Sequence, residues 1–241
     1  MHNYKSLEEL VNIDSPSGYT ANACKYIFDQ LAGLGYKPEY TNKGAVKCSL
    51  GPNPTLAVAA HVDTLGAIVS GIKNNGTLNF SPIGGLLLTS AEGEYVNIIT
   101  LNNKIYTGTL LFNNPSAHAN KDRETEHRNL NNMHIRLDEE VYSKEDVIKL
   151  GVGIGDIVAF EPRYREYANG FIKSRFMDNK AGCFVLFEIA RYCKEKQINP
   201  PVELFFSNYE EVALVPGLHI DEKSSTTANK KENTNQELPK K

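Results

Sequence analysis

Side chains that could bind a metal ion or move a proton occur in three separate segments of this 241-residue chain. The segment AAHVDTLG contains His61 and Asp63, SRFMDNKAG contains Asp178, and SNYEEV contains Glu210 and Glu211. A histidine can bind a metal through one ring nitrogen while a nearby carboxylate holds the other N–H and orients the ring. Each segment follows a predicted strand or opens a predicted helix, where α/β proteins place their sites.

Each segment taken alone has a simpler explanation. Asp63 can cap the turn after a strand, and Asp178 can be an ordinary helix N-cap. The adjacent Glu210 and Glu211 can form a solvated strand end. Taken together, one imidazole and several carboxylates favour Zn²⁺, Co²⁺ or Mn²⁺ over a thiolate site. Two such metals that share a carboxylate are suited to the hydrolysis of amide bonds.

The elements that would position these residues alternate between helix and strand. Apolar residues at helical spacing predict helices over 4–14 and 20–33, and the apolar run TLAVAA predicts a strand that stops at His61. An amphipathic helix is predicted from about Asp178, and the apolar run VELFFS predicts a strand before the two glutamates. Because both strands are apolar on both faces, we expect an α/β fold with helices on both sides of the sheet.

The region between these α/β segments has a different pattern. Short β-rich runs separated by turn signals such as Asn75-Gly76 predict a small β-barrel over residues 68–163, inserted into the α/β domain. The α/β domain then consists of residues 1–67 plus 164–220. Residues 221–241 are too polar to offset the entropy of ordering, so they are predicted to form a disordered tail.

The composition disfavours several classes of partner. Lys and Arg total 26 against 29 Asp and Glu, so the net charge of −3 disfavours nucleic acid. No apolar run approaches the ~20 residues of a membrane helix, and the first residues lack a signal peptide's apolar stretch, so no membrane partner is expected. The same features lead us to expect a cytoplasmic protein. The four cysteines form no C-x-x-C pair, which favours reduced thiols.

The three motifs together resemble metallopeptidase family forty-two, the glutamyl and deblocking aminopeptidase group. They occur here as AAHVDTLGAIV, GFIKSRFMDNKAGC and SNYEEV, and the resemblance extends from about Ser15 to Val212. It implies a three-layer α/β/α metallopeptidase domain with an inserted β-barrel that joins subunits into a homo-oligomer. It also implies two divalent metal ions, Zn, Co or Mn, and peptide substrates that are cleaved at their N-terminal residue.

The same resemblance implies a role for each site residue. His61 would bind one metal ion, Glu211 would bind the other, and Asp178 would bridge the two. Glu210 would be the general base that takes a proton from the attacking water. Asp63 would orient the imidazole of His61.

The chain departs from the family pattern after Val212. Family members continue with further strands that carry an Asp ligand and a His ligand, whereas this chain continues into its polar tail. We therefore expect a C-terminally truncated family member with an incomplete site, reduced metal occupancy and weak or absent activity. Two alternatives stay open: a catalytically inactive fragment that acts as an oligomerisation or binding module, and a related metal-dependent carboxypeptidase or deacylase.

Overall fold

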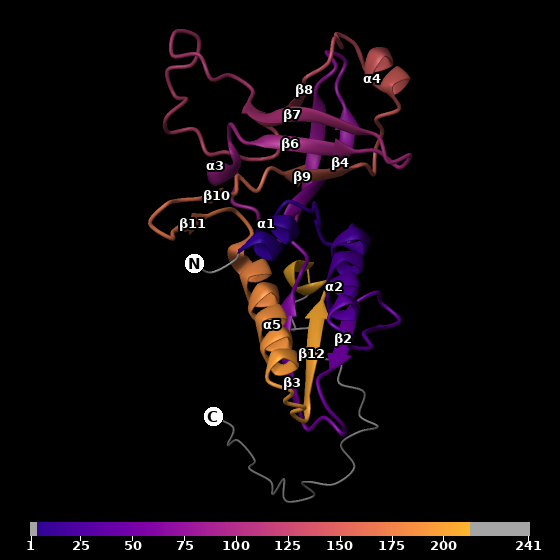
Figure 1. The fold of residues 1–241 in the computed structure, drawn as a ribbon. Coiled ribbons are helices and arrows are strands. Elements are labelled where there is room, and N and C mark those ends of the chain that lie inside the picture. The colour runs from indigo at the N-terminus through magenta and orange to yellow at the C-terminus, as the bar shows by residue number, and fades with distance from the viewer. Residues whose placement is uncertain (1–3, 213–241) are drawn as a thin grey trace, which may run out of the picture.

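The computed structural model describes residues 4–212, which form two lobes (Figure 1). One lobe combines helices with an open sheet, and the other is a closed β-barrel. The tail predicted for residues 221–241 lies outside the described residues. Within residues 4–212, no helix has the length and apolarity needed to cross a membrane.

The α/β lobe is built on a four-stranded sheet in the order β1-β2-β12-β3. Its strands are β1 (Glu39–Tyr40), β2 (Val46–Ser49), β12 (Val202–Ser207) and β3 (Leu56–His61). Strand β12 runs antiparallel to β2 and parallel to β3, with Ser207 opposite His61. The carboxyl ends of β3 and β12 therefore meet at one edge of the sheet, which places the segments that follow them side by side.

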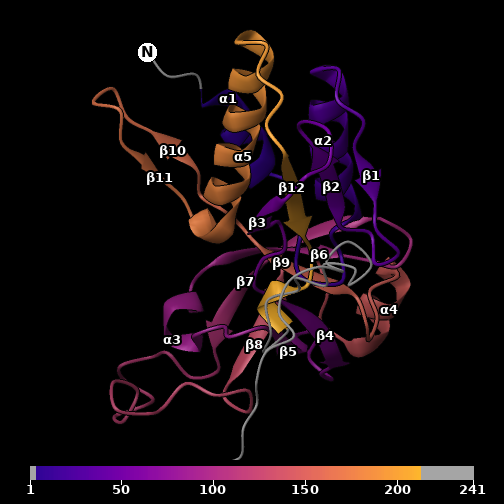
Figure 2. The same ribbon diagram turned by 90° about the horizontal axis from the view of Figure 1, so that it is seen from below.

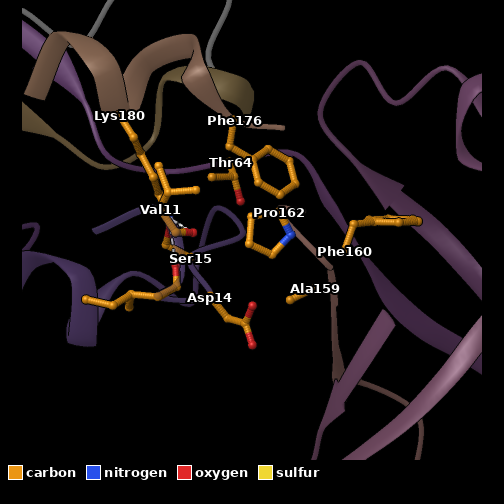
Figure 3. A pocket seen from close by; sticks show the side chains of 10 residues that line it. Val11, Asp14, Ser15, Thr64, Ala159, Phe160, Pro162, Phe176 and Lys180 are labelled. Atoms are coloured by element: carbon orange, nitrogen blue, oxygen red, sulfur yellow. Dashed lines mark hydrogen bonds between the residues drawn. The ribbon is translucent and has the colours of Figure 1, made fainter. Parts of the chain in front are cut away.

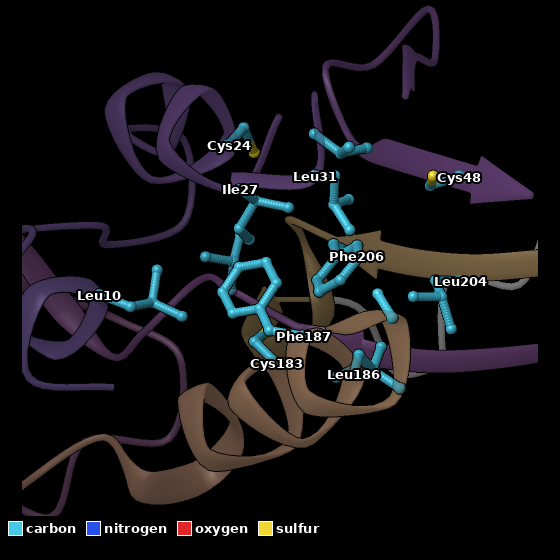
Figure 4. Close-up of a cluster of buried hydrophobic side chains, with 14 of the residues drawn as sticks. Leu10, Cys24, Ile27, Leu31, Cys48, Cys183, Leu186, Phe187, Leu204 and Phe206 are labelled. Atoms are coloured by element: carbon cyan, nitrogen blue, oxygen red, sulfur yellow. The ribbon is translucent and has the colours of Figure 1, made fainter. Parts of the chain in front are cut away.

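Three helices contribute to one apolar layer over this sheet: α1 (Lys5–Val11), α2 (Ala21–Gly33) and α5 (Met177–Glu195). Their apolar side chains form a single buried cluster with alternate residues of the strands (Figure 4). Phe187 of α5 stacks on Phe206 of β12 with ring centroids 5.5 Å apart. Others in the cluster are Leu10, Ile27, Leu31, Cys183, Leu186 and Leu204. This packing holds α5 against the two strands whose carboxyl ends carry site residues.

The opposite face of the sheet carries apolar side chains that the described residues leave uncovered. Leu56 is 58% exposed, Ala59 is exposed and Phe205 is partly buried. In residues 4–212, β12 is the one strand that pairs with β3. The α/β class with an inserted barrel is confirmed. The second helical layer expected from the two-sided apolar strands is not supplied by residues 4–212.

The second lobe is a closed barrel in the order β4-β5-β8-β7-β6-β9. Its strands are β4 (Gly66–Ile72), β5 (Leu78–Ile83), β6 (Tyr95–Ile99), β7 (Ile105–Phe112), β8 (Met133–Leu137) and β9 (Ile157–Phe160). A second buried cluster fills the interior and includes Val69, Leu78, Ile98, Leu110 and Ile135. Two short helices, α3 (Leu88–Ala91) and α4 (Lys144–Leu150), lie in the connections. Helix α4 starts where the Ser143 hydroxyl caps the Asp146 amide.

Two further elements lie near the junction of the lobes. The hairpin of β10 (Arg165–Glu166) and β11 (Ile172–Lys173) leads from the barrel to α5 and projects sideways (Figure 2). The 3₁₀ helix η1 (Glu210–Val212) follows β12 and lies close to the segment just after β5. A Cβ atom added to Gly84, just after β5, would fall 3.0 Å from the carbonyl oxygen of Glu211. The two glutamates of η1 therefore lie where the edge of the sheet faces the barrel.

Candidate functional site

The imidazole of His61 and the carboxylate of Asp178 are in contact although 117 residues separate them. His61 Nε2 lies 3.1 Å from Asp178 Oδ1. His61 ends β3 and is 6% exposed, whereas the side chain of Asp178, in the first turn of α5, is 92% exposed. An incoming ion or substrate can thus reach the buried imidazole from the Asp178 side.

Glu210 brings a second carboxylate to the same imidazole. Its Oε2 atom lies 3.6 Å from His61 Nε2. Two ligands bound at about 2.1 Å to one tetrahedral zinc ion lie about 3.4 Å apart, so both spacings suit a shared cation. Among residues 4–212, however, no group of three or more His, Cys, Asp or Glu side chains has the geometry of a metal site. The donors that are present fit part of a metal site.

Asp63 is fully buried and contacts both the imidazole and the turn that carries the glutamates. His61 Nδ1 lies 3.0 Å from the carbonyl oxygen of Asp63 and 3.6 Å from its carboxylate. The carboxylate accepts hydrogen bonds from the backbone amides of Glu210 (3.2 Å) and Glu211 (3.1 Å). The sequence predicted that Asp63 orients His61 or caps the turn that follows β3. Its hydrogen bonds to η1 could not be predicted, because every residue except proline has a backbone amide and the sequence does not show which amides will lie near Asp63.

The site concentrates negative charge around one imidazole. Burial lowers the pKa of His61, but the hydrogen bonds and charge of Asp63, with the charge of Glu210, outweigh burial and raise this pKa to about 9. Burial would raise the pKa of Asp63, yet the bonds from His61 and its other donors hold it below its ordinary value. Burial and the neighbouring carboxylates raise the pKa of Glu211. A field that keeps a proton on His61 also attracts a divalent cation, which would replace that proton.

A buried lysine behind Asp178 was not anticipated from the sequence. Lys180 is 1% exposed, and its Nζ donates to the carbonyl oxygens of Leu10 (3.0 Å) and Ile13 (2.6 Å) at the end of α1. Figure 3 shows Lys180 with Ser15 in the narrow gap between α1 and the barrel. A lysine near a helix start is ordinarily solvated, so only its closeness to Asp178 in the sequence could have drawn attention to it.

Comparison of the sequence with known proteins gives a consistent result. A family model described as M42 glutamyl aminopeptidase matches residues 44–228. The protein YhfE of Bacillus subtilis (strain 168) is 40% identical over 211 residues, which cover 86% of this chain and 61% of YhfE. The glutamyl aminopeptidase of Lactococcus lactis subsp. cremoris (strain MG1363) is 27% identical over 222 residues, 89% of this chain and 61% of that enzyme. This chain thus spans about three-fifths of the length of both relatives.

Solved structures show the same fold. The TET1 peptidase of Pyrococcus horikoshii matches with a TM-score of 0.75 and 22% identity, over 87% of this chain and 62% of that chain. That peptidase can assemble into a tetrahedron or a large octahedral shell. At this level of identity, the likeness establishes a shared fold.

Proposed function

The chain belongs to the M42 glutamyl aminopeptidase family, and from this premise we propose that it is a metal-dependent aminopeptidase that releases N-terminal residues from peptides. The observation that carries the proposal is the contact of His61 Nε2 with Asp178 (3.1 Å) and with Glu210 (3.6 Å). These residues come from three distant segments and meet near the carboxyl ends of β3 and β12, which supports a cation site beside a base.

The proposed ligands are His61, Asp178 and Glu211, with Asp178 shared between two ions of Zn²⁺, Co²⁺ or Mn²⁺. When bound, such ions polarise a scissile carbonyl and lower the pKa of water. Glu210, which stands beside the proposed ligands, would accept the proton of the attacking water and pass it to the leaving amine. Asp63 would keep the imidazole and η1 in place through the bonds described above.

The proposed setting of this activity is the cytoplasm, in a homo-oligomer assembled through the barrel. All four cysteines are free and buried, as expected for a reducing compartment. The barrel exposes apolar side chains at two adjoining turns, with Leu101 82%, Ile105 59% and Ile154 69% exposed. The backbone amide of Leu101 donates to Asp156, which ties these turns together. Exposed apolar side chains grouped in this way are typical of protein interfaces.

The test measures bound metal and the cleavage of aminoacyl-anilides by the full chain. We expect weakly bound divalent metal, slow cleavage that a chelator abolishes, and a further loss of about a hundredfold in kcat in Glu210→Gln, because the base is removed. The matched control is Glu203→Gln on β12, since Glu203 bonds Ser49 at a distance from the site. Its kcat should equal that of the wild type. Absence of both metal and cleavage in the wild type would contradict the proposal.

One observation favours a second function, that of an inactive binding or oligomerisation module. The part of the chain from residue 4 to 212 holds no group of three donors with the geometry of a metal site. A wild-type chain that assembles through its barrel, yet neither binds metal nor cleaves anilides, would have this function.

A further inference from the structure

Residues 15–17, just before α2, are joined to the segment that follows β3. The backbone amide of Ser17 donates to the carbonyl of Thr64 (3.2 Å), and the amide of Thr64 donates to Ser15 (2.9 Å). The hydroxyl of Ser15 donates to the carbonyl of Val62 (2.9 Å). Pro16 lies so close that a Cβ atom on Gly66 would fall 2.6 Å from it. Residues 15–17 are therefore held beside the segment that contains Asp63 by hydrogen bonds to Val62 and Thr64 and by the packing of Pro16 on Gly66.

The hydroxyl of Ser17 donates a hydrogen bond to Asp63 Oδ2, the same oxygen that accepts the amide of Glu211. The other oxygen, Oδ1, accepts the amide of Glu210. Ser17 is 7% exposed and Asp63 is 0% exposed, so water does not compete for these bonds. Hydrogen bonds to a buried carboxylate are among the stronger ones in proteins. The Ser17 hydroxyl thus helps to orient the Asp63 carboxylate, which in turn accepts the backbone amides of both glutamates.

The same loop also restrains the chain just before η1. Asn208 is 5% exposed, and its side-chain amide lies 3.3 Å from Thr20 Oγ1 and 2.9 Å from the carbonyl oxygen of Lys43. Thr20 stands three positions after Ser17 in the sequence. The segment before α2 is therefore linked to the glutamate segment twice. Thr20 bonds Asn208 directly, and Ser17 is linked to η1 because both bond Asp63.

We propose that Ser17 is a positioning residue of the candidate site, which acts through Asp63 to hold Glu210 and Glu211 in the orientation that binds metal and accepts a proton. The inference rests on the proposed function for its chemical meaning, while the positioning itself can be observed in the metal-free chain. Outer partners of metal ligands commonly contribute 10–100-fold to metal affinity. Loss of the Ser17 hydroxyl removes one of the donors that fix the Asp63 carboxylate, so its bonds to η1 loosen.

The experiment compares Ser17→Ala, Ser17→Thr and the matched control Ser15→Ala in the full chain. Ser15 lies in the same loop and is also buried, but its hydroxyl bonds a backbone carbonyl instead of Asp63. Hydrogen exchange of the peptide that contains residues 208–212 is followed by mass spectrometry without metal. Affinity for Co²⁺ alone is measured by titration, with the visible absorption of the bound ion as the signal.

We expect the Glu210 and Glu211 amides of Ser17→Ala to exchange about tenfold faster. Co²⁺ affinity should fall by about tenfold, the lower limit for direct partners of metal ligands, because Ser17 acts through Asp63. Ser17→Thr should restore both, and Ser15→Ala should leave both near the wild-type values. Should Ser17→Ala fail to fold, Ser17→Cys places a weaker donor at the same point and should show the same changes to a smaller extent.

Unchanged exchange of residues 208–212 in Ser17→Ala, or an equal increase in Ser15→Ala, would overturn the inference. A wild-type chain that binds no Co²⁺ while Ser17→Ala still exchanges faster would overturn the proposed function and support the positioning role. The exchange readout thus separates the two failures.

Discussion

At the scale of single residues, a buried ammonium group connects two helices behind the candidate site. Lys180 of α5 donates to carbonyl oxygens at the end of α1, where a cation also suits the helix dipole. Lys180→Met leaves these buried acceptors without a donor, so we expect the free energy of unfolding to fall by about 3 kcal/mol in urea denaturation. Lys194→Met is the matched control on the same helix, because Lys194 donates to Gly35 at an exposed position. The control should lose about 1 kcal/mol or less, and equal losses would contradict the assigned role.

A second residue near the junction of the lobes should make stability depend on pH. Burial raises the pKa of Asp14, although the amide of Asn97 in β6 and the charge of Lys180 oppose this shift. A carboxyl whose pKa is raised by folding favours the folded state when protonated, and this contribution is lost as the pH rises through its folded pKa. At pH 7 the charged carboxylate therefore destabilises the fold.

The corresponding prediction concerns Asp14→Asn, which has no charge and can still bond Asn97. At pH 7 the variant should unfold at higher urea concentration than the wild type. The difference should shrink as the pH falls toward 3.8, the ordinary pKa of the group, because the folded state is then largely protonated and the unfolded state becomes protonated as well. Urea denaturation curves recorded between about pH 3.5 and 7 check this, because the carboxyl changes its charge within this range. A difference that grows toward low pH would refute the assigned direction.

At the scale of elements, β12 directs one phenylalanine to the covered face of the sheet and the next one to the uncovered face. Phe206 is fully buried against Phe187, whereas the adjacent Phe205 points to the uncovered face and is partly exposed. We expect Phe206→Ala to reduce the free energy of unfolding by about 4 kcal/mol, because it leaves a cavity in the core. Phe205→Ala should cost about 1 kcal/mol. Chemical denaturation measures both, and similar losses would mean that the second face is covered in solution.

Most elements could be predicted from the sequence because their periodicity is local. The helices expected over 4–14 and 20–33 occur as α1 (Lys5–Val11) and α2 (Ala21–Gly33), and the helix expected from about Asp178 begins at Met177. The hairpin β10-β11 was missed, because strands of two residues carry no measurable alternation. Its turn at Asn169-Gly170, where Gly170 has φ of +84°, was the available signal.

At the scale of the whole molecule, we propose that the subunits of a homo-oligomer contact one another through the barrel. Leu101 lies in the β6-β7 turn and is the most exposed of the apolar side chains proposed for the interface, at 82%. Leu101→Asp would place a charge in a desolvated contact, so we expect the dissociation constant of the oligomer to rise about tenfold or more. Size-exclusion chromatography with light scattering measures the mass of each species. The control Val185→Asp, on the exposed face of α5, should keep the wild-type mass. Identical masses for all three proteins would exclude this surface as the interface.

The sequence by itself predicted the kinds of elements and the inserted barrel, and it suggested a set of donor residues, because hydrophobic periodicity and side-chain chemistry are local properties. Only the tertiary structure decided which donors meet. In the fold, His61 lies against Asp178 and Glu210. The Asp63 carboxylate accepts hydrogen bonds from Ser17 and from two backbone amides. Hydrogen-bond partners far apart in the chain depend on how strands and helices pack. No local pattern records that a serine near the start of the chain will hold glutamates some two hundred residues later.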